Sequence, residues 1–255
     1  MTGTGSWLAG SISIPGIIPR MNFYFPHDTY HTPPKTTRHW LDRLLLGSRW
    51  ALHLHFVWEI IKARRLVGQG RYDRLAWAGT SYAIFKMVER CSGRFHITGL
   101  DNIRDLNEPV VFVSNHMSSL EGNIFGCLLP LHQEISYVVK ESLLRYPVFG
   151  PVVAAREPIA VGRTNPRDDL QKVLVEGLER LHRDQSIVLF PQHTRTAAFI
   201  PAEFNSMGVK LAARAGVPVV PIAVKTDFLI NGRTLRDFGP LNRRQPIHLA
   251  FGQPL

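Results

Sequence analysis

The chain has 255 residues, which suits one large α/β domain or one domain with an appendage. Its 45% hydrophobic and 20% charged residues are ordinary for a globular protein. Two cysteines, Cys91 and Cys127, provide no disulfide framework; one bridge is arithmetically possible, but a reducing compartment is expected.

The charge balance is less ordinary. The 30 basic and 20 acidic residues give a formal net charge of +10. A positive field of this size favours an anionic partner, which means nucleic acid, a lipid surface, or a phosphorylated or CoA-like substrate. The first residues contain no basic side chain before Arg20, so no secretory signal is predicted.

Residues 1 to 35 are rich in glycine, serine, threonine and proline, and they end in Thr32-Pro-Pro-Lys35. This composition predicts a flexible arm. His27 and His31 are four residues apart, a spacing that would put two imidazoles on one side of a helix. The surrounding prolines disfavour a helix, so no metal site is predicted.

Residues 38 to 66 are dense in leucine and tryptophan but are interrupted by charged residues. A membrane span needs about 20 consecutive apolar residues. The pattern therefore favours a helix that lies in the membrane interface. Between Lys35 and Arg71, eight basic residues stand against two acidic ones, an excess that an anionic cytoplasmic leaflet would attract. The alternative is a core-facing helix with a solvated basic face.

A second helix is predicted at about residues 72 to 89, and Gly68 and Gly70 separate it from the first. Residues 36 to 92 are thus expected to form a helical hairpin that binds the cytoplasmic face of a membrane.

From Arg94 onward, candidate strands alternate with helices, which predicts an α/β domain over residues 93 to 255. The fold class is α/β, with a largely parallel central sheet flanked by helices, preceded by an N-terminal membrane-associated two-helix motif. The candidate strands are residues 95–98, 110–114, 135–140, 158–161, 186–190, 217–223 and 247–251.

Two helices in this domain have clear boundary signals. The first has Asn165 as its cap, Pro166 at its first position and acidic residues in its first turn. The second is expected from about residue 202 to residue 215, where Gly216 ends it.

His116 and Glu121 follow directly after the strand candidate 110–114. Ligands of open α/β sheets bind beyond the strand ends, so this is a place for chemistry. A carboxylate five residues from a histidine can fix one ring nitrogen and leave the other to accept a proton. The spacing alone does not distinguish such a base from a surface histidine.

Three further segments follow or form apolar strands. Phe190–Thr196 carries Arg195, whose guanidinium suits a phosphate or carboxylate. Val161-Gly-Arg163 places a second arginine after another short strand. Val217–Ala223 is apolar and is interpreted as scaffold. Taken singly, each arginine is more often a solvated loop residue than a ligand.

Together and in this order, the segments resemble the glycerolipid acyltransferase family, which includes 1-acylglycerol-3-phosphate acyltransferase. The resemblance covers about residues 90 to 255, and a two-helix N-terminus is also typical of the family. The family's four blocks correspond to Asn115-His116 through Glu121, to Arg163, to Phe190-Pro191 with Thr194-Arg195, and to Val217-Pro218 with Pro221; its basic segment corresponds to Lys140-Glu-Ser-Leu143.

The resemblance implies transfer of an acyl group from acyl-CoA or acyl-carrier protein to a lysolipid hydroxyl, without a covalent acyl-enzyme. His116 would be the general base and Glu121 would hold its imidazole. The implied partners are an anionic membrane surface, the lysolipid acceptor and the thioester donor, with no metal, no organic cofactor and no nucleic acid. The implied substrate-binding residues are Asn115, Lys140, Arg163, Gln192, His193, Thr194 and Arg195.

The sequence departs from the family pattern in three places. Glu121 replaces an aspartate, which lengthens the reach to His116 by one methylene. Gln192 and His193 replace Glu-Gly, which removes a negative charge and adds bulk. Glu157 and Ala160 stand where glycine and phenylalanine are usual. We infer that the acceptor differs from lysophosphatidic acid or binds in a changed pose.

Three alternatives compete with this assignment. The altered blocks allow a non-catalytic relative that keeps the fold to bind lipid. Ser114 and Ser118 flank His116, but the Gly-x-Ser-x-Gly elbow of a serine hydrolase is missing. The charge alone suggests a nucleic-acid binder, but the aromatic residues concentrate in the apolar helices and do not interleave with basic residues as stacking platforms.

Overall fold

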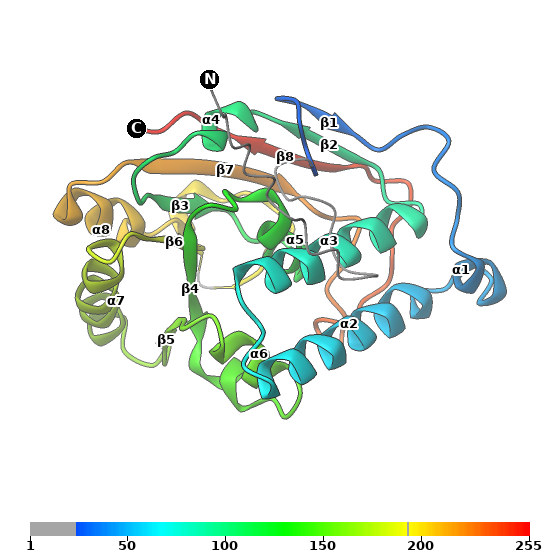
Figure 1. The fold of residues 1–255 in the computed structure, drawn as a ribbon, viewed down its shortest axis with the longest axis horizontal. Helices are drawn as coiled ribbons and strands as arrows, with labels where there is room; N and C mark the ends of the chain where they lie inside the picture. The colour runs from blue at the N-terminus through cyan, green and yellow to red at the C-terminus, as the bar shows by residue number, and fades with distance from the viewer. Residues whose placement is uncertain (1–23, 193) are drawn as a thin grey trace, which may run out of the picture.

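The computed structural model describes residues 24–192 and 194–255, and an eight-stranded sheet runs through this part of the chain (Figure 1). The strands lie side by side in the order β1-β2-β8-β7-β3-β6-β4-β5. Their bounds are β1 Tyr30–His31, β2 Phe95–Thr98, β3 Val111–Ser114, β4 Glu134–Lys140, β5 Ile159–Val161, β6 Gln185–Leu189, β7 Val219–Lys225 and β8 Ile247–Phe251.

The central strands β7, β3, β6, β4 and β5 are all parallel to one another. Strand β8 runs antiparallel to β7, and β2 pairs in parallel with β8. The prediction of a largely parallel central sheet is therefore confirmed. Each predicted strand is found within two residues of its expected ends.

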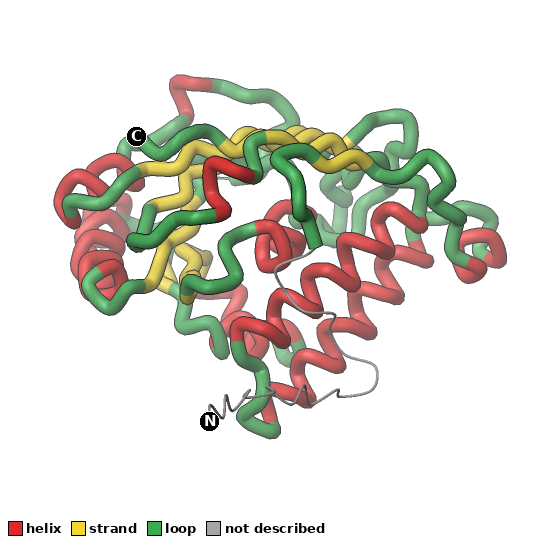
Figure 2. The backbone as a smooth tube through the Cα atoms, turned by 45° about the horizontal axis from the view of Figure 1, so that its top comes forward, coloured by secondary structure: helices red, strands yellow, loops and turns green. Residues whose placement is uncertain are grey.

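Helices cover both faces of the sheet (Figures 1 and 2). Val111 packs in the cluster under α7 and α8, whereas its neighbour Phe112 packs in the larger cluster with α3 and α5. Successive side chains of a strand point to opposite faces, so one short strand supplies both cores. The helix bounds are α1 Trp40–Leu44, α2 Trp50–Gly68, α3 Arg74–Arg90, α4 Asp101–Arg104, α5 Leu120–Leu128, α6 Phe149–Ala154, α7 Pro166–Leu181 and α8 Met207–Ala215, with short 3-10 turns η2 Glu141–Arg145 and η3 Pro201–Glu203.

The boundary signals of α7 and α8 behave as predicted at two of the three ends for which a signal was found. The Asn165 side chain accepts a hydrogen bond from the Arg167 N–H, and Pro166 begins α7. Gly216 ends α8 in the left-handed conformation, at φ 69°. Helix α8 begins at residue 207 and not near 202, because the Asn205 side chain accepts from the Met207 N–H while residues 201–203 form η3.

The two helices expected between residues 36 and 92 are present as α2 and α3, which pack against each other. The single helix expected over residues 38–66 is instead divided into α1 and α2. Leu46 and Gly47 adopt positive φ angles of 51° and 73° between them, which no right-handed helix accommodates. In the described part of the chain, every helix is too short or too polar to cross a bilayer.

Residues 24 to 35 differ from the flexible arm expected for residues 1 to 35, and residues 1 to 23 of that arm lie outside the described residues. Of the residues described there, Tyr30 and His31 pair with β2, and Thr32 donates its backbone N–H to Phe95. Phe25 is buried, and the Tyr24 ring stacks on Tyr82 of α3 at 3.8 Å between centroids. Aromatic burial fixes this segment, a tertiary effect that composition does not reveal.

Candidate active site

The loop after β3 brings His116 and Glu121 together. His116 Nδ1 lies 2.9 Å from Glu121 Oε1. The first turn of α5 carries Glu121, so the chain turns between the two residues and brings the carboxylate back to the imidazole. The additional methylene of glutamate is thus accommodated.

Hydrogen bonds hold the Glu121 carboxylate on both oxygens. Oε1 accepts from the backbone N–H groups of Met117 at 2.6 Å and Ser118 at 2.9 Å. Oε2 accepts from the hydroxyls of Ser118 at 2.9 Å and Thr226 at 2.8 Å. Glu121 is 0% exposed. Burial by itself raises the pKa of this carboxyl, but the hydrogen bond and charge of His116 and the Ser118 N–H outweigh it, so the pKa is lowered.

The His116 ring is fixed on its other side by Phe190, at the end of β6. Their rings stack with centroids 4.1 Å apart. The backbone of His116 is held as well, because its N–H donates to Gln192 Oε1 at 2.5 Å and its carbonyl accepts from the Thr196 N–H. Since Nδ1 faces Glu121, Nε2 is the nitrogen left for chemistry.

Two residues expected to bind substrate have structural contacts instead. Asn115 is buried, and its side-chain amide exchanges two hydrogen bonds with the backbone of Val224 on β7. Gln192 is buried between the His116 N–H and the Thr196 hydroxyl. Both amides therefore position the His116 loop, because their polar atoms are already paired with protein groups.

Four of the predicted site residues lie around one large cavity. His116, Lys140, Arg163 and Arg195 all line a cavity of about 540 Å³. Lys140 ends β4, and its side chain is exposed. The parallel strands end at one edge of the sheet, which is why residues far apart in sequence meet here. One histidine and three cationic side chains therefore share this cavity.

A tight loop after β5 presents Arg163. Its φ is 61°, and the N–H groups of Gly162 and Arg163 both donate to the Asp169 carboxylate, at 3.0 and 2.9 Å. Burial lowers the pKa of the Arg163 guanidinium; the like charge of Arg195 adds to this effect and Asp169 opposes it. The two arginines are thus close enough to interact. An arginine remains charged at neutral pH in such a site.

Glu157, which replaces the usual glycine of this block, has φ 47°. A left-handed backbone is the conformation that glycine adopts without steric cost. The carbonyl of Glu157 accepts from Ser136 and from Arg180, so the surrounding structure maintains the strained residue.

Arg195 is paired with the loop between β7 and β8. Its Nη1 lies 2.7 Å from Asp237 Oδ1 and 3.3 Å from Asn231 Oδ1. Asn231 also donates to the Met117 carbonyl at 2.9 Å, so this loop links Arg195 to the His116 loop. Thr194 accepts from Arg236 of the same loop. His193 lies outside the described residues.

The larger part of the cavity is apolar. From its polar mouth it extends along the second half of β4, where Tyr137, Val138 and Val139 line it beside Lys140. At the other end of this strand, Arg156 forms an ion pair with Glu134 and lies over the Trp77 ring. The apolar lining comes from α2, α3, β4, η2, α6 and the residue before α6, and it includes Ile60, Ile61, Ile84, Leu143, Val148 and Val153.

We compared the chain with known protein families, proteins and structures. A family model described as Acyltransferase matches residues 94–225, just over half of the chain. The chain belongs to the acyltransferase family. A 1-acyl-sn-glycerol-3-phosphate acyltransferase of Pseudomonas aeruginosa is 32% identical over 66% of this chain and 65% of its own length. A lyso-ornithine lipid O-acyltransferase of the same organism is 26% identical over 58% of this chain and 60% of its own length.

The chain therefore spans less than two thirds of the length of these two relatives. The crystal structure of the 1-acyl-sn-glycerophosphate acyltransferase PlsC from Thermotoga maritima superimposes with a TM-score of 0.60. The match covers 84% of this chain and 85% of that chain at 20% identity, which shows that the two share a fold.

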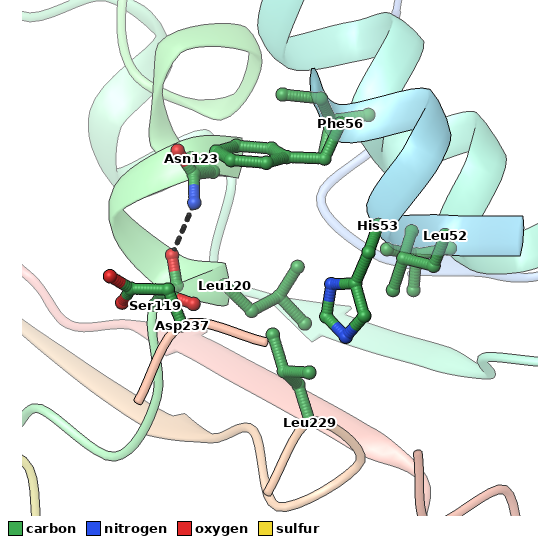
Figure 3. Close-up of a pocket in the computed structure, with 10 residues that line it drawn as sticks. Leu52, His53, Phe56, Ser119, Leu120, Asn123, Leu229 and Asp237 are labelled. Atoms are coloured by element: carbon green, nitrogen blue, oxygen red, sulfur yellow. Dashed lines mark hydrogen bonds between the residues drawn. The ribbon is translucent and has the colours of Figure 1, made fainter. Parts of the chain in front are cut away.

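A second, much smaller cavity adjoins the large one. Figure 3 shows residues that line it, among them His53 of α2 and Asp237. Ser119, just before α5, Asn123 of α5 and Asp237 line both cavities. His53 Nε2 lies 2.8 Å from the Gly239 carbonyl. Burial lowers the pKa of His53, so neutral imidazole is favoured there.

Sequence reasoning missed three residues of this site: Thr226, Asn231 and Asp237. Thr226 follows β7 directly, so the rule that found His116 after β3 could have found it. Asn231 and Asp237 lie in an irregular loop without periodicity. Arginines such as Arg233 and Arg236 surround Asp237 in the sequence, so the local pattern indicates a basic loop and does not mark its carboxylate.

Proposed function

We propose that this chain is a membrane-associated O-acyltransferase that moves a fatty acyl group from an acyl thioester to the hydroxyl of a lysophospholipid-like acceptor. The observation that carries the proposal is one cavity in which a carboxylate-backed imidazole and three cations lie beside a long apolar space. Relatives named as acyltransferases of 1-acylglycerol-3-phosphate support it.

In the proposed reaction, His116 Nε2 takes the proton of the acceptor hydroxyl, while Nδ1–H donates to Glu121. The oxygen attacks the thioester carbonyl carbon, the new ester C–O bond forms and the C–S bond breaks. The departing thiolate receives the proton from the imidazolium. The ionised Glu121 stabilises the imidazolium between these steps. Both exchanged bonds belong to the substrates, so the reaction needs no cofactor.

The cations and the apolar space have separate tasks in this proposal. Lys140, Arg163 and Arg195 attract anionic groups of the substrates, whether acceptor headgroup or carrier phosphates. The apolar space holds an acyl chain. The donor is acyl-CoA or acyl-carrier protein, and a comparison of the two donors distinguishes them.

An exposed apolar stripe supports membrane association. Trp50, Leu54, Val57 and Trp58 recur at helical spacing along the outside of α2 and are exposed. Val57 also lines the cavity, so the stripe adjoins the proposed lipid site. Exposed patches of this kind, with tryptophan and nearby arginines, suit the interface of an anionic membrane, and we place it at the cytoplasmic face.

The test is product identification. Purified protein is incubated with acyl-CoA or acyl-carrier protein donors and a panel of lysolipids, and products are identified by mass spectrometry. The proposal expects a diacylated product that forms with wild type and not with His116→Ala. Lipid binding without product in every combination would support a non-catalytic lipid-binding relative instead.

Vesicle flotation tests the membrane role. Trp50→Ser with Trp58→Ser is expected to weaken binding to vesicles that contain anionic lipid, because both rings are exposed on α2. Val175→Ser on the exposed side of α7 is the matched control. Equal flotation of all three proteins would contradict the proposed surface.

A further inference from the structure

The cavity contains a carboxylate among its cations. Asp237 is the single acidic residue among the described residues that line it, and Lys140, Arg163 and Arg195 line the same space. A phosphate-binding site gains nothing from such a neighbour, because a phosphomonoester carries about −1.5 to −2 charges at neutral pH and a carboxylate repels it.

The Asp237 carboxylate is accessible as well as paired. Its side chain is 40% exposed, and Oδ1 lies 2.7 Å from Arg195 Nη1. Within residues 24–192 and 194–255, its second oxygen, Oδ2, has no hydrogen-bond partner. Asp237 lines both the smaller and the larger cavity, and Figure 3 shows its side chain in the smaller one. A donor that enters the mouth of the cavity can therefore reach Oδ2.

The charges at the mouth divide into two parts. Asp237 offsets the charge of Arg195, so this side of the mouth is close to neutral and offers an acceptor of hydrogen bonds. Arg163, near which Asp169 lies, and Lys140 line the same cavity and supply further cations there. A headgroup with one acid group and one ammonium group matches this division, because each of its charges meets an opposite one.

We propose, on the basis of the function proposed above, that the acceptor is an amphoteric lysolipid whose ammonium group binds Asp237 and whose acid group binds Arg163 and Lys140. Two lipid sources supply this chemistry: an amino-acid lysolipid such as lyso-ornithine lipid, and lysophosphatidylethanolamine. The 26% identical relative named for lyso-ornithine lipid agrees with the first source.

The experiment removes the ammonium charge of the lipid acceptor and the carboxylate charge of Asp237, singly and together. Lyso-ornithine lipid, its N-acetylated form, lysophosphatidylethanolamine and lysophosphatidic acid are compared as acceptors, with wild type and Asp237→Asn. Wild type is expected to prefer the free amine over the N-acetylated lipid by about tenfold in kcat/KM, the value of one charge-assisted hydrogen bond. Asp237→Asn should erase this preference, and Asp237→Glu should retain part of it.

Asp227→Asn is the matched control, because Asp227 lies in the same loop and pairs with Lys225 away from the cavity. It should leave the preference unchanged. If Asp237 only holds Arg195 in place, Asp237→Asn will reduce kcat/KM for all acceptors by one common factor, and the proposal is overturned. A wild-type preference for lysophosphatidic acid also overturns it. The ratio of kcat/KM for lyso-ornithine lipid to kcat/KM for lysophosphatidylethanolamine shows which of the two lipids is the preferred acceptor.

Failure of the proposed function has a different signature. In that case wild type forms no acylated product from any of the four lipids. Turnover of lysophosphatidic acid that is insensitive to Asp237 would leave the acyltransferase proposal standing and refute the amphoteric acceptor alone.

Discussion

The two ends of the large cavity are built in different ways. At the mouth, directional hydrogen bonds fix the Glu121 carboxylate and the backbone of the His116 loop. Along α2, α3 and α6, apolar side chains define only a shape. The loss of one hydrogen-bonding atom at the mouth should therefore change the rate of reaction, whereas a change of volume in the apolar part should alter which chains are accepted.

The largest effect is expected for His116→Ala at the mouth. Removal of the general base should lower kcat by about 10³-fold, within the range known for such catalysis. Single-turnover acylation measures it. His182→Ala, an exposed histidine at the end of α7, is the control and should retain full activity. A residual rate within tenfold of wild type would argue against His116 as the base.

Glu121→Gln keeps the shape of the side chain and removes its charge. We expect a loss of about 10²-fold in kcat, because the imidazolium is no longer stabilised. The pKa of Glu121 is lower in the folded protein than its ordinary 4.5, so its charge stabilises the fold above that pH. This contribution should disappear as the pH falls through the lowered pKa.

Urea unfolding of wild type and Glu121→Gln measures the pH effect. Their difference in unfolding free energy should be greatest near neutral pH and should shrink below about pH 4. A difference that grows on acidification would contradict the assigned direction.

Thr226→Val tests the support behind the carboxylate. The hydroxyl lost is fully buried and donates to Glu121 Oε2 at 2.8 Å. We expect a destabilisation of about 1–3 kcal/mol in urea unfolding and a fall of about tenfold in kcat. Thr234→Val, at an exposed position of the same loop, should change neither quantity measurably.

The smallest effect is expected in the apolar part. Val153→Phe should fill part of the cavity and shift acyl-chain preference toward shorter chains, by about fourfold in kcat/KM for each methylene excluded. A donor series of different chain lengths measures it. Val175→Phe, exposed on α7, should leave the profile unchanged. A uniform loss over all chain lengths would place Val153 outside the chain-binding space.

The sequence predicted those features that depend on local pattern. Alternating apolar runs located the strands, and the rule that ligands bind beyond strand ends located His116 and Glu121. The predicted roles of Asn115 and Gln192 do not match their contacts, because nothing local shows that an amide will pair with the backbone of a distant strand. The break at Leu46 and Gly47 also depends on packing that helical periodicity does not report.

The short strand β1 has a practical consequence for anyone who trims this protein. Removal of residues 1–35 as a supposed tail would take away Tyr30 and His31, which cover the outer edge of β2. An uncovered edge offers unpaired N–H and C=O groups to the same edge of another molecule. Trimmed protein is therefore expected to aggregate, whereas a cut before Tyr24 would leave the edge protected.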